Sequence, residues 1–270
     1  MCIRDRLKEK DHKKVVIVIP IYQSVLKDYE MSALKNNLKV LAKYPAVFLK
    51  PTGLDITNLR SQFPQVGEVV VSNCWLGTKR GIAGYNEMML SSDFYHLFLG
   101  YEYMLICHVD AWVFRDELDF WCNCKYDHIA SPWPKRDRYT HFPLKQYLEL
   151  KLFFKPKRKN IHCQMFGRVG NGGFSLRRVR PFYNACFKYS KEISYFNSKS
   201  CDLYNEDVFW SLIPKELKTP SAHEALKFAF DIKPQVCSKQ NNYQLPMAVH
   251  GFHQPKRREF WKQYIDCLSC

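Results

Sequence analysis

The stretch YEYMLICHVDAWVF, residues 101–114, places Asp110 directly after an apolar run. The run over 103–110 has the length and composition of one buried strand. An unpaired carboxylate inside a protein costs several kcal/mol, roughly the effective penalty for a buried ion. Asp110 must therefore reach water, a partner or a metal. We predict a strand that ends at Asp110 and brings this carboxylate to the open edge of a sheet.

Strand-like and helix-like segments alternate along the first 115 residues around this strand. Short connections between such segments indicate a parallel, doubly wound sheet. In sheets of this kind, ligands bind beyond the carboxyl ends of the strands. The predicted strands are 15–22, 46–51, 68–72, 103–110 and 128–133, and the predicted helices are 31–43, 55–62, 81–99 and one that starts near Asp116.

Composition agrees with a single globular core. The chain has 270 residues, of which 46% are hydrophobic, and this is enough for one sizeable domain. No apolar run approaches the roughly 20 residues that a membrane-spanning helix needs. The 11 cysteines are scattered along the chain. We interpret them as the reduced thiols of a cytoplasmic protein.

The segment 134–165 differs from the rest of the chain in charge. Of the net charge of +15, about half lies between 135 and 165, where basic residues are interleaved with aromatic ones. We predict an insertion with a helix at 143–153. Such a patch favours polyanions, namely nucleic acid, an anionic lipid surface or a phosphorylated substrate, although it is also compatible with a solvated loop. Its cations are Lys135, Arg136, Arg138, Lys145, Lys151, Lys155, Lys157, Arg158 and Lys159.

Three further motifs carry polar groups that are suited to chemistry. GNGGFSLR, residues 170–177, has three glycines within four positions, which indicates close backbone approach or positive φ. Glu206 and Asp207 begin an apolar-faced helix predicted over 205–214, and HGFH occupies 250–253. Each motif alone has an ordinary structural explanation, such as a tight turn or a helix start stabilised by its dipole.

The order of these motifs resembles that of GT-A glycosyltransferases. In that fold, an acid of a D-x-D-type motif ends the fourth strand and holds a divalent metal, which clamps the diphosphate of a nucleotide-sugar. Here the motif is His108-Val109-Asp110, without the first acid. The resemblance implies a Mn²⁺ or Mg²⁺ ion on Asp110 and His250, with His253 as the reserve ligand. Lysine and arginine side chains are the alternative to the ion.

The pair Glu206-Asp207 resembles the acid pair at a helix start in inverting members of the fold. One acid of that pair is the general base, and Asp207 is our first choice, with Glu206 second. The resemblance also implies contacts to the donor from other positions. These are Lys79 and Arg80 to phosphate, Tyr85 and Asn86 to the nucleotide, and His108, Asn171, Gly172 and Gly173 around the donor.

Several stretches resemble more closely an uncharacterised bacterial family of glycosyltransferase-like proteins, a domain of unknown function seen near polysaccharide-synthesis genes. These stretches are YEYMLICHVDAWVF, ASPW (130–133), GNGGFSLR, NEDVFW (205–210) and PMAVHG (246–251). The resemblance implies a Rossmann-type, mostly parallel central sheet flanked by helices. It also implies sugar transfer from a nucleotide-diphosphate sugar to a hydroxyl of a glycan or glycolipid, in cell-surface polysaccharide or glycolipid synthesis.

The resemblance covers 15–262, which we interpret as a single domain. Within it we expect a nucleotide-sugar-binding half at 15–133, the basic insertion at 134–165 and an acceptor and catalytic half at 166–262. The leader 1–14 and the tail 263–270 are expected to lie outside this domain.

Two other functions are compatible with the sequence. A non-enzymatic binder of polyanions or nucleic acid would use the basic and aromatic segment, but it leaves the four motifs unexplained, so we expect no specific nucleic acid. A metal-dependent nucleotidyl- or phosphotransferase would use the same acid, but PIYQS (20–24) is not a Gly-rich phosphate loop. For the transferase, the basic segment predicts contact with an acidic acceptor or with the inner membrane face.

Overall fold

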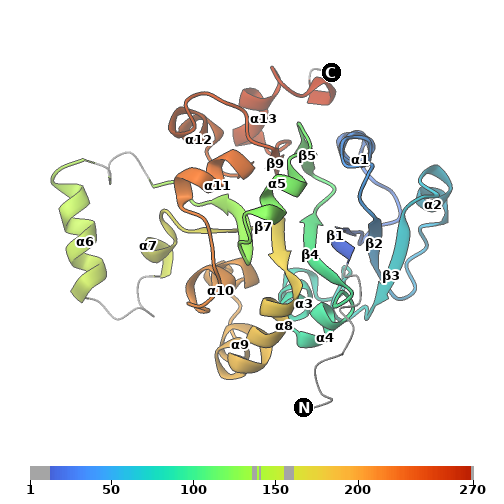
Figure 1. Ribbon diagram of the computed structural model, residues 1–270, viewed down its shortest axis with the longest axis horizontal. Helices are drawn as coiled ribbons and strands as arrows, with labels where there is room; N and C mark the ends of the chain where they lie inside the picture. Colours follow the sequence, from blue (N-terminus) through green and yellow to red (C-terminus); the bar gives the residue numbers. More distant parts are fainter. Residues whose placement is uncertain (1–12, 136–138, 140, 155–160, 269–270) are drawn as a thin grey trace, which may run out of the picture.

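The fold is built on a central sheet with helices on both faces (Figure 1). The computed structural model describes residues 13–135, 139, 141–154 and 161–268. The sheet has six strands in the order β3-β2-β1-β4-β7-β6. Four of them are parallel to one another, namely β1 (Lys13–Pro20), β2 (Ala46–Pro51), β3 (Gly67–Val71) and β4 (Tyr101–Cys107). Strand β7 (Val169–Arg178) runs antiparallel between β4 and β6 (His128–Pro132).

Strand β1 shows why this sheet forms. Val15, Ile17 and Ile19 pack into the core on one face of the sheet, whereas Val16 and Val18 pack into the core on the other face. A strand that is buried on both faces needs a continuous run of apolar, β-branched residues, and this run has that composition. The mainly parallel sheet flanked by helices is therefore confirmed.

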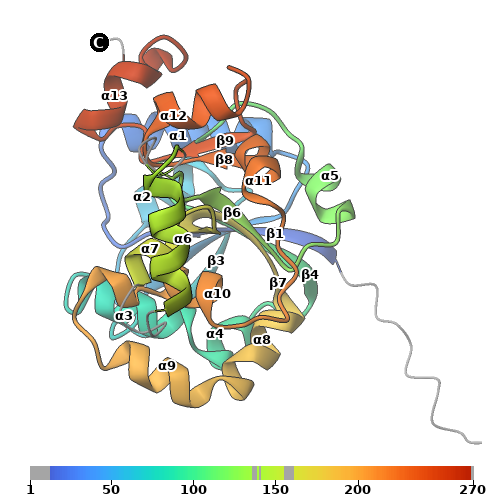
Figure 2. The same ribbon diagram turned by 90° about the vertical axis from the view of Figure 1, so that its left-hand side faces the viewer.

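Two layers of helices cover the sheet (Figure 2). One face is covered by α1 (Asp28–Val40), α2 (Thr57–Gln62), α5 (Leu118–Asn123) and α11 (Ala222–Phe228). The other face is covered by α3 (Gly81–Met89), α4 (Ser92–His96), α8 (Val179–Lys188), α9 (Ser190–Asn197) and α10 (Glu206–Leu212).

A small second sheet lies beside α1 on the same face of the central sheet and packs into the same core. It consists of β5 (Ala111–Val113), β9 (Ala248–His250) and β8 (Ala229–Phe230), in the order β5-β9-β8. Helices α12 (Pro234–Gln240) and α13 (Pro255–Trp261) and the 3₁₀ turn η4 (Asp266–Leu268) follow along the chain. Ile265 and Leu268 pack in the same apolar cluster as Trp261. The chain therefore contributes to the core as far as Leu268, inside the segment expected to be a tail.

Two sequence predictions need correction. The predicted helix 81–99 is two helices, α3 and α4, because the Ser91 hydroxyl accepts a hydrogen bond from the Asp93 backbone N–H (3.1 Å) and caps a new helix. The stretch GNGGFSLR lies within strand β7 rather than forming a turn, and its glycines are not among the residues with positive φ. The close approach expected of these glycines does occur, as described below.

Helices α6 (Leu144–Phe154) and α7 (Ile161–Met165) occupy the basic insertion between β6 and β7. Helix α6 agrees with its predicted range to within one residue and stands apart from the sheet (Figure 1). Among the helices that the structure describes, none has the length and apolarity to cross a bilayer. The predicted cations Arg136, Arg138, Lys155, Lys157, Arg158 and Lys159 lie outside the described residues.

Candidate active site

The candidate site lies where the order of the parallel strands reverses. From β1, the chain proceeds to β2 and β3 on one side, whereas β4 pairs with β1 on the other. Ligands of doubly wound sheets bind in the crevice at such a point, beyond the carboxyl ends of the strands. Asp110 follows β4 and Tyr22 follows β1. Burial and the nearby Asp110 carboxylate raise the pKa of Tyr22.

Asp110 and His250, 140 positions apart in the sequence, meet at this edge. His250 Nε2 lies 3.2 Å from Asp110 Oδ1. The contact is fixed by the second sheet, because Ala111 pairs with His250 and the Gly251 N–H donates to the Asp110 carbonyl oxygen (2.9 Å). With His108, these side chains form a group whose ligand atoms all lie within 4.8 Å of one another. The predicted metal ligands are thus brought together.

Charge is balanced inside this group. Burial alone would raise the pKa of Asp110, but His250, His108 and His253 hold it well below its usual range. Burial opposes the charged form of His250, yet Asp110 and Asp231 raise its pKa well above the usual value. Burial and His250 lower the pKa of His108 to about 4, so His108 is neutral at physiological pH.

A buried carboxylate orients His250 from behind. Asp231, which follows β8, lies 2.8 Å through Oδ2 from His250 Nδ1. Arg257 on α13 contacts the other Asp231 oxygen and donates to the His250 carbonyl oxygen at 3.3 Å. Asp231 therefore holds Nδ1 and leaves Nε2 to face Asp110, as carboxylates do behind metal-bound histidines.

Sequence reasoning missed both of these supporting residues. Asp231 directly follows the apolar run Phe228–Phe230, so it carries the same strand-end signal that drew attention to Asp110. Arg257 lies in a basic stretch of α13 and carries no comparable signal.

The donor set fits a divalent cation. Two imidazoles and one carboxylate suit Mn²⁺ and related ions, and Asp231 supplies the outer partner that such ligands need. The reserve candidate His253 lies farther out, because its Nδ1 is 3.7 Å from Asp110 Oδ2. Its ring stacks on Tyr29 at 4.3 Å, outside the three-residue group.

Helix α3 contacts both the turn that carries His108 and the start of α10. The Tyr85 hydroxyl lies 2.9 Å from His108 Nε2. The Asn86 side chain donates to Asn205 Oδ1 (2.9 Å) and accepts from the Glu206 N–H (3.1 Å). Both residues therefore contact site residues, and their predicted contact with a nucleotide remains a prediction.

The remaining predicted donor contacts lie around this centre. Lys79 is exposed on the segment before α3, and Arg80 pairs with Glu87 at 2.7 Å. Asn171 pairs with Ser131 across β6 and β7, where the register shifts. The roles of Lys79, Arg80 and Asn171 towards a donor remain predictions.

The two acids at the start of α10 have different environments. Glu206 is buried in an ion pair with Arg177, 3.0 Å from Nη2 to Oε2, and Arg177 also donates to the Tyr95 hydroxyl (2.9 Å). The Asp207 carboxylate accepts through Oδ1 from the Val208 N–H at 2.7 Å. Burial and the neighbouring Glu206 carboxylate raise the pKa of Asp207 to about 7. Asp207 therefore changes charge near neutral pH.

Two glycines of β7 allow these side chains to approach the strand. A Cβ on Gly172 would lie 2.5 Å from Glu206 Oε1 and 3.5 Å from Asp207 Cβ. A Cβ on Gly173 would collide with the imidazole ring of His250. Adjacent positions of one strand thus contact the acid pair on one side and the histidine on the other.

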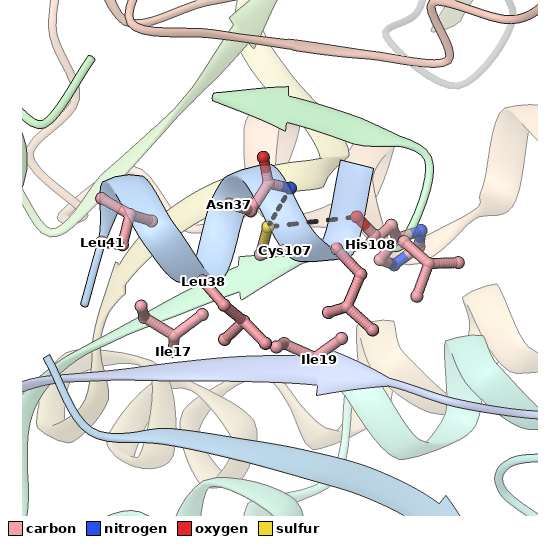
Figure 3. Close-up of a pocket in the computed structure, with 9 residues that line it drawn as sticks. Ile17, Ile19, Asn37, Leu38, Leu41, Cys107 and His108 are labelled. Atoms are coloured by element: carbon pink, nitrogen blue, oxygen red, sulfur yellow. Dashed lines mark hydrogen bonds between the residues drawn. The ribbon is translucent and has the colours of Figure 1, made fainter. Parts of the chain in front are cut away.

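Helix α1 supports the turn that carries His108 and Asp110. Figure 3 shows the small pocket beneath this turn, lined by apolar residues of β1 and α1. The buried Asn37 side chain donates to the Ala111 carbonyl oxygen (2.7 Å) and accepts from the Val113 N–H (2.8 Å). These bonds hold β5, and with it Asp110, against α1.

The family model described as "Protein of unknown function (DUF5672)" matches residues 69–250. The chain belongs to the DUF5672 family. The matched segment includes Asp110, Asp207 and His250. A search of curated proteins found no match for this DUF5672 protein.

Solved structures establish the fold of this DUF5672 protein. The galactosyltransferase LgtC, in complex with donor and acceptor sugar analogues, superimposes with a TM-score of 0.55 at 13% identity, covering 94% of each chain. An active-site mutant of LgtC gives 0.56 at 12% identity, covering 94% of this chain and 95% of that one. The bifunctional glycosyltransferase WbbM gives 0.52 at 12% identity, covering 88% of this chain and 46% of its own. The fold is that of GT-A glycosyltransferases, as the motif order predicted.

We expect Gly173→Ala to disturb the site of this DUF5672 protein selectively. The added methyl would overlap His250 and push the imidazole away from Asp110. Mn²⁺ affinity should fall about 10–100-fold, as it does when ligand support is lost, and electron paramagnetic resonance titration of Mn²⁺ measures it. Gly100→Ala is the matched control, since its Cβ would meet no atom within 4 Å. Equal affinities of the two variants would contradict a role for the Gly173–His250 contact.

Proposed function

We propose that this DUF5672 protein is a glycosyltransferase that moves a sugar from a nucleotide-diphosphate sugar to a hydroxyl of a glycan or glycolipid, in the synthesis of cell-surface polysaccharide or glycolipid. One observation carries the proposal. Asp110, His108 and His250 form a compact ligand group beyond β4, and neighbouring residues of α3 contact both this group, through Tyr85 and His108, and the start of α10 next to Asp207, through Asn86 and the Glu206 N–H. The GT-A fold also supports a function in glycosyl transfer.

A divalent cation, Mn²⁺ or Mg²⁺, would be held by Asp110, His250 and His108. As a Lewis acid, such an ion neutralises charge on the diphosphate leaving group. The protein's own contribution is orientation. Asp231 and Arg257 fix the His250 ring, and the hydroxyl of Tyr85 contacts His108.

Asp207 is proposed to take the proton of the acceptor hydroxyl. As the acceptor oxygen bonds to the anomeric carbon, the bond from that carbon to the diphosphate oxygen breaks and the proton moves to the Asp207 carboxylate. A positioned base of this kind contributes about 10²–10⁴-fold. Glu206 is less suited to this role, because Arg177 already engages both of its oxygens in the interior.

We expect Asp207→Asn to lower kcat about 10²–10⁴-fold, the range for loss of a general base. Because the pKa of Asp207 is raised to about 7, the wild-type rate should rise with pH up to about 7 and then level off. A pH–rate profile with a soluble acceptor measures this rise in rate between acid and neutral pH. A wild-type profile that is flat between about pH 5 and 8, or a variant that keeps the wild-type rate, would remove Asp207 from the mechanism.

The same substitution has a readout that does not depend on activity. A carboxyl whose folded-state pKa lies above its unfolded value stabilises the fold less as pH rises through the folded-state pKa. Asparagine does not titrate, so it does not destabilise the fold in this way as the pH rises. The unfolding temperature of Asp207→Asn should therefore exceed that of the wild type above about pH 7, and the difference should shrink in mild acid.

Metal removal tests the cation directly. We expect EDTA to abolish donor turnover and added Mn²⁺ to restore it, while the fold stays intact by circular dichroism. Release of a nucleoside diphosphate from the nucleotide-sugar identifies glycosyl transfer, whereas release of pyrophosphate from a nucleoside triphosphate supplied in its place would assign the site to nucleotidyl transfer. Turnover that EDTA leaves unchanged would remove the metal and leave lysine and arginine side chains to neutralise the leaving group.

A further inference from the structure

Helix α6 exposes an apolar face to solvent. Phe153 is 82% exposed, Phe154 75%, and Leu150 and Tyr147 57% each, and Phe142 just before the helix is 81% exposed. Solvent-facing surfaces of helices normally carry polar side chains. Contiguous apolar exposure of this kind marks an interaction surface. This cluster is separate from the catalytic group described above.

The geometry of the helix separates this face from its packed side. Leu148, 5% exposed, is a buried apolar residue of α6. At about 100° per residue, Leu150, Phe153 and Phe154 lie on the side of the helix opposite Leu148. Phe153 and Phe154 pack edge to face at 5.0 Å. The apolar face is thus the one that points away from the protein.

Positive charge accompanies the apolar face. Lys145 lies exposed on α6, Lys151 lies one turn before the helix ends, and Lys135 is exposed near the start of the insertion. The sequence of the segment 135–165 carries nine basic residues against two acids. Basic residues near an anionic bilayer contribute about 1 kcal/mol each, and aromatic side chains partition into its interface. The apolar face and its cations match the two layers of such a surface, the acyl boundary and the anionic headgroups.

We propose that α6, together with Phe142, docks onto the surface of an anionic lipid bilayer. Leu150, Phe153 and Phe154 enter the headgroup and acyl boundary, while Lys145 and Lys151 remain among the anionic headgroups. A nucleic acid would engage the cations and stack on the aromatic rings, but it would leave Leu150 without an apolar partner. This surface does not depend on the reaction proposed above, because its residues lie outside the catalytic group.

Vesicle co-sedimentation of the full chain tests the proposal, with phosphatidylcholine vesicles that contain or lack phosphatidylglycerol. The wild type should bind the anionic vesicles, and the triple variant Leu150→Ser/Phe153→Ser/Phe154→Ser should bind on the order of tenfold more weakly. The matched control is Val25→Ser/Phe120→Ser/Phe187→Ser, which removes side chains that are 78%, 59% and 58% exposed elsewhere. The control should bind as the wild type does, and all three proteins should have similar unfolding temperatures.

Three results would overturn the proposal. The first is failure of the wild type to bind anionic vesicles, and the second is equal loss of binding in the triple variant and its control. The third is a concentration-dependent dimer that only the triple variant converts to a monomer, because the face would then be covered by a second copy. Donor turnover with a soluble acceptor should be the same in all variants, so failure here is distinguishable from failure of the proposed transferase activity.

Discussion

Asp110→Asn is expected to reduce sugar transfer about 10²–10³-fold, the range for loss of one group that stabilises developing charge in an active site. The amide keeps the size of the carboxylate and can still contact His250 Nε2, but it removes the negative charge that a cation requires. The fold should survive, because Asp231 still balances His250. Nucleoside diphosphate release measures the rate, and circular dichroism monitors the fold.

Asp55→Asn is the control for this change. Asp55 also follows a parallel strand, β2, but its carboxylate accepts from the Thr57 N–H (2.9 Å) and hydroxyl. We expect the rate of this variant to stay near that of the wild type. If Asp110→Asn and Asp55→Asn behave alike, the carboxylate at position 110 does not serve the reaction.

Arg177→Met is expected to destabilise the protein by about 3–5 kcal/mol, the usual cost of leaving one member of a buried ion pair uncompensated. Arg177 is 0% and Glu206 3% exposed, and the guanidinium also donates to Tyr95 and to Ser175 Oγ (3.1 Å). Removing the cation leaves the Glu206 carboxylate without this partner in the interior. Urea unfolding followed by tryptophan fluorescence measures the loss.

The neighbouring arginine provides a matched control. Arg178 pairs with Glu102 at 3.1 Å on the surface, where both side chains are 38% exposed. Arg178→Met should cost less than about 1 kcal/mol, as surface pairs do. The double variant Arg177→Met/Glu206→Gln should recover part of the loss by removing the unpaired charge. Equal destabilisation by Arg177→Met and Arg178→Met would show that the interior pair is not a special contributor.

The sequence predicted the parallel strands well, because each is a short apolar run, including the partly exposed edge strand β3. Strand β2 was predicted with its observed bounds, Ala46–Pro51, and β1 and β3 were displaced by two residues or fewer. Strand β7 was not predicted, because three glycines within four positions are typical of turns. Here the glycines are needed for the close approach of Glu206 and His250, which only the folded chain brings to the strand.

The sequence indicates residues of the candidate site where polar residues end apolar runs or begin helices. Asp110, Asp207 and His250 carry such signals, and the order of the motifs joined them. Arg177 and Arg257 were not predicted, because an arginine in a basic stretch resembles a solvated surface residue. Their roles depend on Glu206 and Asp231, which lie 29 and 26 positions away in the sequence. Pairings of this kind are set by tertiary structure rather than by local pattern.

The central claim is that Asp110, His250 and His108 bind a cation together with the diphosphate of a nucleotide-sugar. The measurement that tests it most directly is the unfolding temperature of the wild type and of Asp110→Asn, with a panel of nucleotide-diphosphate sugars, in Mn²⁺ or in EDTA. A ligand that binds only the folded state raises this temperature. We predict that at least one donor raises it in Mn²⁺ alone, and only in the wild type. A donor shift of the same size in EDTA, or in Asp110→Asn, would contradict the claim.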